Sequence, residues 1–530
     1  MMALAAITVF LVKLLRHRRR MLTLRKQGLP MPPYNAIFGH LLFMANIARK
    51  LPSDSHGHYL PTEIRRALPE LPPIFYLDIW PMGPPLLVIT SASGAYQIAQ
   101  ENSLPKHDDV LSFLQPLVGK HGLVTMEGDE WKFWRSIFNS GFNMNHLLTL
   151  VPSIVDDTRT YCEVLREWAG RKEIFPLLEA TSMLTMDMSG RATLGTRLNA
   201  QRSRGGELVS AFRSQAKWMP APNESIFARN LNPIRSIIYR YNLWRMDRFL
   251  SHELDNHPTA RRESTKVQKS RVVIDLALEN YLCGSPKKTN SDLDATFKTF
   301  AMSQIKLFIF AGYDTTAATA IYAIHLLSRN PLALQRLVEE HASIFGSDLS
   351  KIADLIIDQP QLVNRLPYTS AVIKETLRLY PPVSNTRKAT SDFSLVSADG
   401  TRFPTDGFLL WGVHYAIHHS TLHWPSPEAF LPQRWLTGPE DPLYPAKDAW
   451  RPFEKGPRNC IGQELALLEI RIILVMVMRE FEVKEAYMEW DTSRERKDVR
   501  HVNGDRAYQV LLGSTKPRDG YPCRVKVREE

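Results

Sequence analysis

Between Arg451 and Glu469 the chain reads Arg451-Pro-Phe-Glu-Lys-Gly-Pro-Arg-Asn-Cys460-Ile-Gly462-Gln-Glu-Leu-Ala-Leu-Leu-Glu469. A thiolate is a strong iron ligand, and on haem iron it pushes electron density toward oxygen and favours O–O cleavage. Gly456 and Gly462 let the backbone turn sharply and approach a flat macrocycle closely. The stretch therefore suits a haem-ligating thiolate at Cys460, with an ordinary buried thiol as the alternative.

The residues on either side of this cysteine suit the same chemistry. Residues 463–470 are predicted to begin a helix. We expect the dipole of this helix and its free N–H groups to lower the pKa of the Cys460 thiol. Arg458 lies two residues before the cysteine and supplies a fixed cation of the kind that a haem propionate binds.

The stretch resembles the haem-binding signature of the cytochrome P450 superfamily, F-x-x-G-x-R-x-C-x-G, whose fixed positions are filled by Phe453, Gly456, Arg458, Cys460 and Gly462. The resemblance implies that these residues bind haem b and that Cys460 is the axial ligand of its iron. It also implies a mainly α-helical fold with a smaller β region (α+β), in which the haem lies between a long central helix and the cysteine loop. Within this family, the sequence most resembles fungal microsomal members that act on secondary metabolites in polyketide and mycotoxin pathways.

The composition bounds the class of protein and its partners. Among 530 residues, 44% are hydrophobic and 23% are charged, which is typical of a folded globular protein. Four scattered cysteines without a C-x-x-C pair argue against a zinc ribbon or a disulfide framework, and fit a reducing compartment. The net charge of +11 points to a membrane surface and not to nucleic acid, because seven basic residues gather near the start: Lys13, Arg16, Arg18, Arg19, Arg20, Arg25 and Lys26.

The N-terminal segment is predicted to be a membrane anchor. Residues 1–15 are apolar apart from Thr8 and Lys13, and as a helix they reach roughly 22 Å, short of the roughly 30 Å hydrocarbon core. We expect an anchor over residues 1–20, a basic and proline-rich hinge over 21–35, and a catalytic domain over 36–530. The positive-inside rule then gives a single-pass protein of the endoplasmic reticulum membrane with a cytosolic catalytic domain. An amphipathic surface helix or a cleaved targeting peptide is the alternative.

Two further segments carry residues for the haem propionates. Trp131 and Arg135 are four residues apart and share a helical face, where a Trp N–H and an Arg fork can hold a carboxylate. The alternative is that such a pair is only a partly buried aromatic side chain beside a solvated charge, without a ligand. In the family that the chain resembles, W-x-x-x-R holds a propionate, so the resemblance gives this role to both residues. It gives the same role, on a less regular spacing, to Arg387.

The longest predicted helix covers residues 292–328 and contains Ala311-Gly312-Tyr313-Asp314-Thr315-Thr316. Gly312 has no side chain to exclude a ligand, and Thr315 can bond back to the carbonyl one turn earlier. A packed helix with a stray polar turn is the alternative. The segment is similar to the distal motif of the cytochrome P450 family, which implies that Asp314 and Thr315 are catalytic and deliver protons.

The remaining motifs are structural. Glu375 and Arg378 are three apart on a helix that begins at Pro367, and the resemblance joins them to Arg434 as a brace for the cysteine loop. Strands are predicted over residues 75–89 and 383–410, and a hairpin over 508–515. Residues 156–254 are predicted to be mainly helical, and residues 259–271 to form a solvated loop.

The resemblance implies a monooxygenase that inserts one atom of O2 into a lipophilic small molecule. No G-x-G-x-x-G fingerprint opens a βαβ unit, so electrons must come from a separate NADPH-cytochrome P450 reductase, with or without cytochrome b5. Lys132 and Lys455 are candidate docking cations for it. Two alternatives stay open: a haem-thiolate isomerase or peroxygenase that needs no reductase, and a membrane-anchored haem protein that binds a ligand without turnover.

Overall fold

A computed structural model describes residues 1–203, 205–219, 232–256, 271–283 and 294–529. Of the loop predicted over residues 259–271, residues 259–270 lie outside this described part. The helices are α1 Met2–Lys26, α2 Leu41–Ala48, α3 Tyr59–Ala67, α4 Ala92–Tyr96, α5 Asp108–Val118, α6 Gly128–Asn139, α7 Met144–Thr149, α8 Val151–Arg171, α9 Leu177–Leu194, α10 Ala200–Ser203, α11 Glu207–Trp218, α13 Pro233–Asp255, α14 Val273–Cys283, α15 Ala295–Arg329, α16 Pro331–Phe345, α17 Ile352–Asp358, α18 Pro367–Leu379, α19 His414–His418, α20 Gln463–Glu480 and α21 Tyr487–Ser493.

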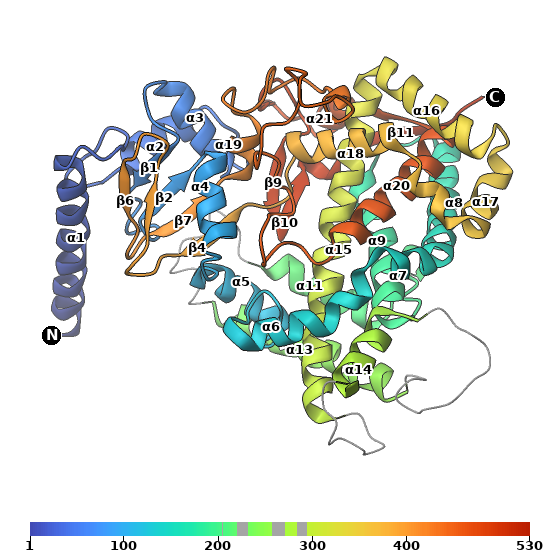
Figure 1. Ribbon diagram of the computed structural model, residues 1–530, viewed down its shortest axis with the longest axis horizontal. Helices are drawn as coiled ribbons and strands as arrows, with labels where there is room; N and C mark the ends of the chain where they lie inside the picture. The colour runs from blue at the N-terminus through green and yellow to red at the C-terminus, as the bar shows by residue number, and fades with distance from the viewer. Residues whose placement is uncertain (204, 220–231, 257–270, 284–293, 530) are drawn as a thin grey trace.

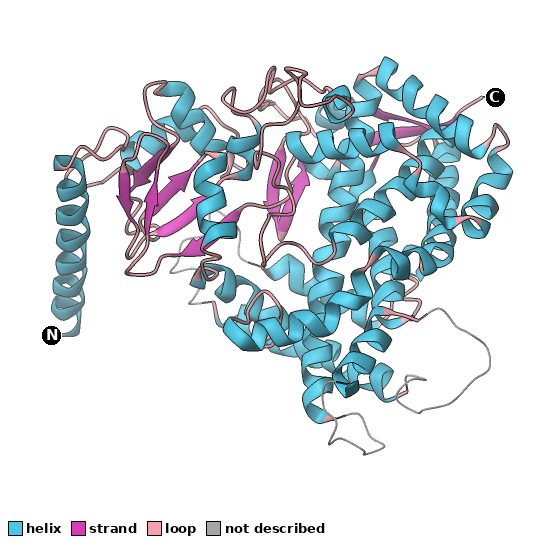
Figure 2. Ribbon diagram, viewed as in Figure 1, coloured by secondary structure: helices cyan, strands magenta, loops and turns pink. Residues whose placement is uncertain are grey.

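The strands form small sheets beside the helices (Figure 2). One sheet has the order β1-β2-β7-β4, in which β2 and β7 are parallel and the other pairs are antiparallel. The remaining strands pair as β5 with β6, β9 with β10, and β3-β11-β8. The strands are β1 Ile74–Leu77, β2 Leu86–Ile89, β3 Phe175–Pro176, β4 Asn385–Lys388, β5 Ser394–Val396, β6 Arg402–Pro404, β7 Leu409–Gly412, β8 Phe481–Glu485, β9 Gln509–Leu512, β10 Ser514–Pro517 and β11 Pro522–Val527.

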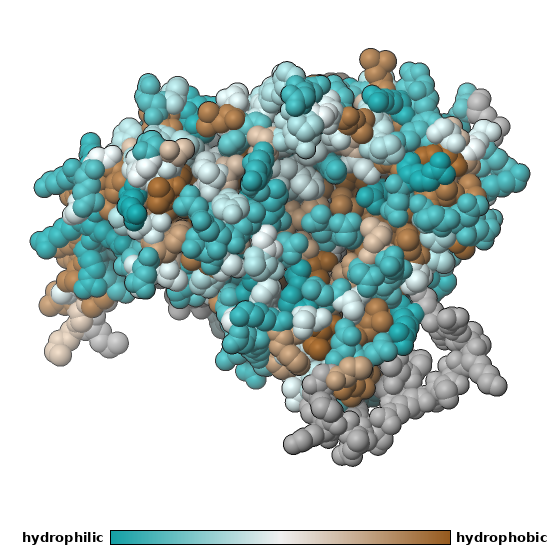
Figure 3. Space-filling view, viewed as in Figure 1, coloured by the Kyte–Doolittle hydropathy of each residue, from teal (hydrophilic) through white to brown (hydrophobic). Residues whose placement is uncertain are grey.

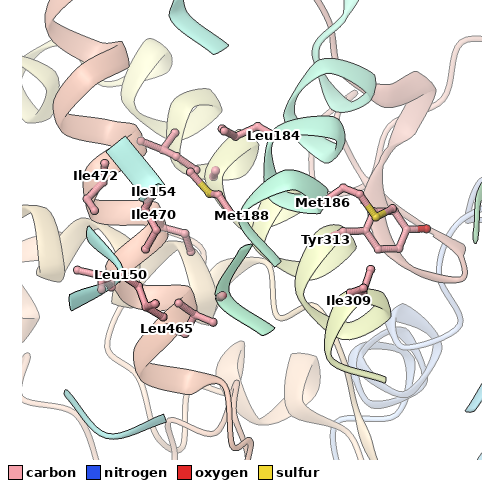
Figure 4. Packing of buried hydrophobic residues seen from close by; sticks show 14 of the residues in the cluster. Leu150, Ile154, Leu184, Met186, Met188, Ile309, Tyr313, Leu465, Ile470 and Ile472 are labelled. Carbon is pink, nitrogen blue, oxygen red and sulfur yellow. The ribbon is translucent and has the colours of Figure 1, made fainter. Parts of the chain in front are cut away.

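Helix α15 runs through the middle of the molecule and confirms the long helix predicted from the sequence (Figure 1). It packs along α9 and against α18, α20 and the strand β10. Buried side chains of α8, α9, α15 and α20 belong to one large core, part of which Figure 4 shows. The predicted hairpin is also confirmed, as β9 and β10 joined by Gly513 at φ +81°. Two segments far apart in the sequence, α15 and the hairpin, are thereby brought into contact.

Helix α1 does not end where the anchor was predicted to end. It continues to Lys26, and Met21 and Leu24 of its second half are buried in the core against the sheet. Arg18 is buried as well, where it forms an ion pair with Asp78 and donates to the Trp80 carbonyl at 3.0 Å. The predicted boundary at residue 20 therefore falls inside a helix whose second half is part of the folded domain.

The first half of α1 has the opposite character. Its apolar side chains gather at one end of the molecule (Figure 3) and are between 43% and 70% exposed: Leu4, Ile7, Val9, Phe10, Leu11, Val12 and Leu15. Among the described residues, one helix is long and apolar enough to cross a membrane, and it is α15. Because 78% of the apolar window of α15 is buried inside the protein, α15 is a core helix. The exposed apolar face of α1 remains the candidate membrane contact.

Glu375 lies at the centre of a fully buried ionic network. Its oxygens accept from Arg378 Nη2 at 2.8 Å, Arg434 Nε at 3.0 Å and the Trp435 indole N–H at 3.0 Å. Arg378 also donates to the His418 carbonyl at 2.8 Å, and His418 Nε2 accepts from the Arg451 backbone N–H at 3.0 Å. The expected brace is thus present, and it reaches the cysteine loop through His418.

We predict that Glu375→Gln lowers the free energy of unfolding by about 3–5 kcal/mol, because it leaves two buried guanidinium groups without a full counter-charge. Glu167→Gln is the control: its carboxylate pairs with Arg202 at 3.0 Å, and both side chains are about half exposed. The control should change stability by about 1 kcal/mol or less. Denaturant midpoints of the three proteins measure this, and equal losses in both variants would contradict the brace.

We also predict that deleting residues 1–20 destabilises the domain more than deleting residues 1–15. The longer deletion removes Arg18 and leaves the Asp78 carboxylate buried without its cation, which costs about 3–5 kcal/mol. Adding Asp78→Asn to the longer deletion should recover part of this loss, since a neutral amide is easier to bury. Thermal denaturation of the three proteins is the measurement. Identical midpoints for the two deletions would show that residues 16–20 contribute nothing to the fold.

Candidate active site

A cavity of about 370 Å³ lies between the middle of α15 and the cysteine loop. Seven of the site residues predicted from the sequence line it: Trp131, Arg135, Thr315, Phe453, Arg458, Cys460 and Gly462. Asp314, Arg387 and Gly456 are not part of its wall. Four ionisable residues that fill no fixed motif position also line it: Lys106, His414, Glu454 and Glu469.

The loop around Cys460 is held in shape by its own backbone. The Cys460 N–H donates to the Phe453 carbonyl at 2.9 Å, and the Asn459 N–H donates to the Gly456 carbonyl at 3.1 Å. Gly456 has φ +87°, and a Cβ there would lie 2.5 Å from the Ala99 carbonyl oxygen. This turn therefore requires glycine, because another residue would be both strained and in collision with the backbone.

Gly462 has a different role from the one expected. Its φ is −86°, which any residue can adopt, so no sharp turn depends on it. Apart from its chain neighbours, no atom of the described part of the chain lies within 4 Å of a Cβ added at Gly462, although the residue is part of the cavity wall. The protein thus leaves open space beside the cysteine, of the kind that close approach of a planar group needs.

The expectation of a lowered thiol pKa at Cys460 is wrong for the protein chain by itself. Cys460 is open to the cavity but surrounded by protein, and this desolvation raises the pKa of its thiol. The Gly462 N–H at the start of α20 and the Arg135 guanidinium do act in the expected direction. Their effect is smaller than that of burial, so a bound cation such as iron must supply the rest of the stabilisation of a thiolate.

The predicted pair on α6 lies beside the cysteine loop. Arg135 donates from Nη1 to the Asn459 carbonyl and from Nη2 to Asn459 Oδ1, both at 3.0 Å. Arg458 stacks over the Trp131 ring, with its guanidinium carbon 4.5 Å from the ring centroid, and pairs with Glu127 at 2.5 Å. Trp131 and Arg135 both line the cavity.

Two further cations lie close together here: Lys106 lines the cavity, and Arg387 forms a β-bridge with Lys106. Arg387 is fully buried and donates from Nη1 to the Leu104 carbonyl at 2.8 Å, while its Nε and Nη2 have no hydrogen-bond partner among the described residues. Burial lowers the pKa of Arg387 to about 10. Burial, with Arg387 and Arg458 nearby, lowers the pKa of Lys106 to about 7. The carboxylates of Glu454 and Glu127 oppose both shifts without cancelling them, so a further anion bound at this end of the site would be stabilised.

These observations fit a haem. A thiol at the cavity wall offers an iron ligand, the space beside Gly462 admits a planar ring, and the guanidinium of Arg387 has two buried nitrogen atoms free to bind a carboxylate. Arg135 and Arg458 add further cations at the same cavity. Lys106 was missed from the sequence because it belongs to no motif and reaches the site only through its β-bridge to Arg387.

The opposite wall is formed by α15. Thr315 Oγ1 donates back to the Ala311 carbonyl at 2.7 Å, as predicted. Gly312 lines the cavity, and it is also where α15 passes close to α9, since a Cβ there would lie 2.7 Å from Ser189 Oγ. Glycine at position 312 therefore serves helix packing as well as access to the cavity.

Asp314 points away from the cavity. It is buried, and its Oδ1 pairs with Lys516 Nζ at 2.8 Å while its Oδ2 accepts from Ser514 Oγ at 3.0 Å. Burial raises the pKa of the Asp314 carboxyl above its usual value, and the two partners on β10 oppose that shift. No local pattern indicates these partners, because the hairpin lies about 200 residues further along the chain.

Comparisons with known proteins agree with this geometry. The family model described as cytochrome P450 matches residues 57–510. Cytochrome P450 monooxygenase polC of Polytolypa hystricis is 41% identical over 98% of this chain and 94% of its own length. Cytochrome P450 monooxygenase acrF of Aspergillus aculeatus is 35% identical over 91% of this chain and 100% of its own.

A solved structure has the same fold. The crystal structure of the cytochrome P450DA heme domain matches with a TM-score of 0.73 at 18% identity, over 94% of this chain and 97% of that one. The cysteine loop, the glycine and threonine face of α15 and the Glu375 network therefore occur in a chain that matches a single family over most of its length. The chain belongs to the cytochrome P450 family and is a monooxygenase.

Proposed function

We propose that this monooxygenase oxidises a lipophilic small molecule, a fungal secondary metabolite, with electrons from NADPH. The observation that carries this proposal is one cavity with the Cys460 thiol in one wall and the Thr315 hydroxyl in another. The rest of the wall is rich in apolar side chains, among them Phe142, Leu307, Phe308 and Val383. An apolar cavity with few polar groups favours a lipophilic substrate held mainly by burial.

Haem b is the cofactor that fits: Cys460 would ligate its iron, and the surrounding cations would bind its carboxylates. The chemistry that a thiolate-ligated haem supplies is the reductive activation of O2. Thr315 Oγ1 lies at the cavity wall and can exchange its bond to the Ala311 carbonyl for one to a group inside the cavity. Asp314 is the next ionisable group along the helix and supplies protons to this hydroxyl when its side chain leaves Lys516.

We propose that electrons arrive from NADPH-cytochrome P450 reductase, with or without cytochrome b5, at the side of the molecule that carries the cysteine loop. Lys132 is 71% exposed and pairs with Asp129 at 2.9 Å, and Lys455 pairs with Asp448 at 3.0 Å. The pair of Lys132 with Asp129 is exposed and contributes little to stability, so exchanging Asp129 for an acidic surface costs little, whereas the pair of Lys455 with Asp448 is partly buried. These lysines are therefore suited to steer an acidic partner and less suited to hold it tightly.

We propose that the first half of α1 anchors the chain in the endoplasmic reticulum membrane as a single pass, with the catalytic domain in the cytosol. The buried pair of Arg18 with Asp78 fixes the point at which the anchor leaves the domain. About 16 residues of α1 precede Arg18, and as a helix they are about 24 Å long. The hydrocarbon core of a bilayer is roughly 30 Å thick, so the side chains of Lys13 and Arg16 have to snorkel to the membrane surface.

We predict that Thr315→Ala uncouples NADPH consumption from product formation. The variant keeps Cys460 and the cations of the site, but it loses the hydroxyl that orients a proton in the cavity, which costs about 10²- to 10⁴-fold in that step. Thr319→Ala is the matched control, because Thr319 makes the same type of back-bond to the Thr315 carbonyl at 2.8 Å but does not line the cavity. The ratio of product to NADPH consumed, with peroxide assayed alongside, measures the effect.

Wild-type coupling in Thr315→Ala would remove this threonine from the proton path. A fall in coupling of similar size in Thr319→Ala would mean that damage to α15, and not loss of a proton donor, explains the effect. The spectrum of the reduced CO complex should stay unchanged in both variants and serves as the check on haem binding.

A further inference from the structure

Glu454 places a carboxylate inside the cysteine loop. It lines the cavity together with Cys460, and its side chain is only 9% exposed. The carbonyl of the preceding residue, Phe453, accepts from the Cys460 N–H at 2.9 Å. Glu454 thus belongs to the same short stretch of backbone as the candidate iron ligand. A buried charge in this position is screened little by water and acts on the whole cavity.

The backbone of Glu454 has a conformation that glutamate rarely adopts. Its φ is +57°, in the left-handed region, and the next sharp turn of the loop is made by Gly456. For a residue other than glycine this conformation is strained, and it persists only where surrounding contacts fix it. The loop therefore keeps a glutamate at a place where a glycine would fit the backbone better.

Both carboxylate oxygens of Glu454 accept hydrogen bonds. Oε1 accepts from Arg451 Nε at 2.8 Å and from the Lys455 N–H at 3.0 Å. Oε2 accepts from the side-chain amide of Asn385 and from His414 Nε2 at 3.3 Å. Burial opposes ionisation of this carboxyl, but the hydrogen bond from His414 and the charge of Arg451 outweigh it and lower the pKa to about 2. Glu454 is therefore negatively charged at neutral pH.

This negative charge reaches the cations at the same end of the cavity. Of the two carboxylates that raise the pKa of Arg387 and of Lys106, Glu454 has the larger effect and Glu127 the smaller. The Glu127 side chain is 39% exposed, pairs with Arg458 and is not part of the cavity wall. Solvent screens an exposed charge more than a buried one, so Glu454 is the carboxylate with the stronger field inside the cavity.

We propose that Glu454 tunes the reduction potential of the iron bound by Cys460 and holds it lower than a neutral residue at position 454 would. This inference rests on the proposed haem-thiolate site. A fixed negative charge favours the more positive, oxidised form of a nearby metal ion, so it makes the uptake of one electron from the reductase less favourable. Glu454 itself exchanges neither protons nor electrons. Its role is electrostatic and separate from the proton path through Thr315.

The reduction potential of the haem-loaded protein, measured by spectroelectrochemical titration, tests this proposal. Glu454→Gln removes the charge but keeps the length of the side chain, so the potential should rise. Glu127→Gln is the matched control, and loss of the more exposed carboxylate should raise the potential by less. Glu454→Asp keeps the charge and should stay closer to the wild type than Glu454→Gln. A potential in Glu454→Gln that is no higher than in the wild type, or no higher than in Glu127→Gln, overturns the proposal.

Lys106→Gln distinguishes an effect of charge from general damage to the site. It removes a positive charge from the same end of the cavity, so the potential should fall. The double variant of Lys106→Gln with Glu454→Gln should lie between the two single variants. A shift in the same direction in both single variants would mean that disturbance of the site, and not charge, moves the potential, which would overturn the proposal.

The spectrum of the reduced CO complex and the helical circular dichroism check that each variant is folded and holds its cofactor. If Glu454→Gln does not bind haem, Glu454→Ser takes its place, because serine removes the charge and is small enough to let water reach Arg451. The same rise in potential is expected from it. Absence of a thiolate-type spectrum in the wild type would contradict the proposed function, whereas an unchanged potential in a variant with a normal spectrum overturns the Glu454 inference alone.

Discussion

The buried carboxylate of Glu375 holds the cysteine loop in place. It binds the guanidinium groups of Arg378 and Arg434, and Arg378 extends the network to His418. His418 accepts from the first residue of the loop, Arg451. A buried ionic network of this kind adds little net stability but makes loss of one partner costly, so it fixes one arrangement of α18 relative to the loop. The position of the thiol depends on that arrangement.

The active site combines an apolar cavity with an excess of positive charge at one end. Arg387 and Lys106 are held there against a desolvation cost that lowers the pKa of both. An anionic ligand would stabilise such an arrangement, which is why the site fits a cofactor with carboxylates. The same desolvation raises the pKa of the Cys460 thiol. Cofactor binding and the ionisation of this cysteine are therefore linked, since iron and thiolate stabilise each other.

Patterns of residues close together in the sequence predicted individual helices and turns of the fold. The helix over Ala295–Arg329, the proline at the start of α18 and the hairpin around Gly513 all follow from residues close together in the chain. Long-range partners could not be predicted in the same way. Arg18 looked like one of several membrane-facing cations, and only the folded chain places it against Asp78. The partners of Asp314 on β10 and the opening of Glu469 onto the cavity likewise depend on packing between distant elements.

The central claim is that Cys460 supplies the axial sulfur of the haem, and replacing that sulfur tests it most directly. Cys460→Ala should keep the helical circular dichroism of the wild type but lose the thiolate-type spectrum of the reduced CO complex. Cys283→Ala, which changes an exposed free cysteine, should keep both. An unchanged CO spectrum in Cys460→Ala would contradict the haem-thiolate assignment and, with it, the account of the site given above.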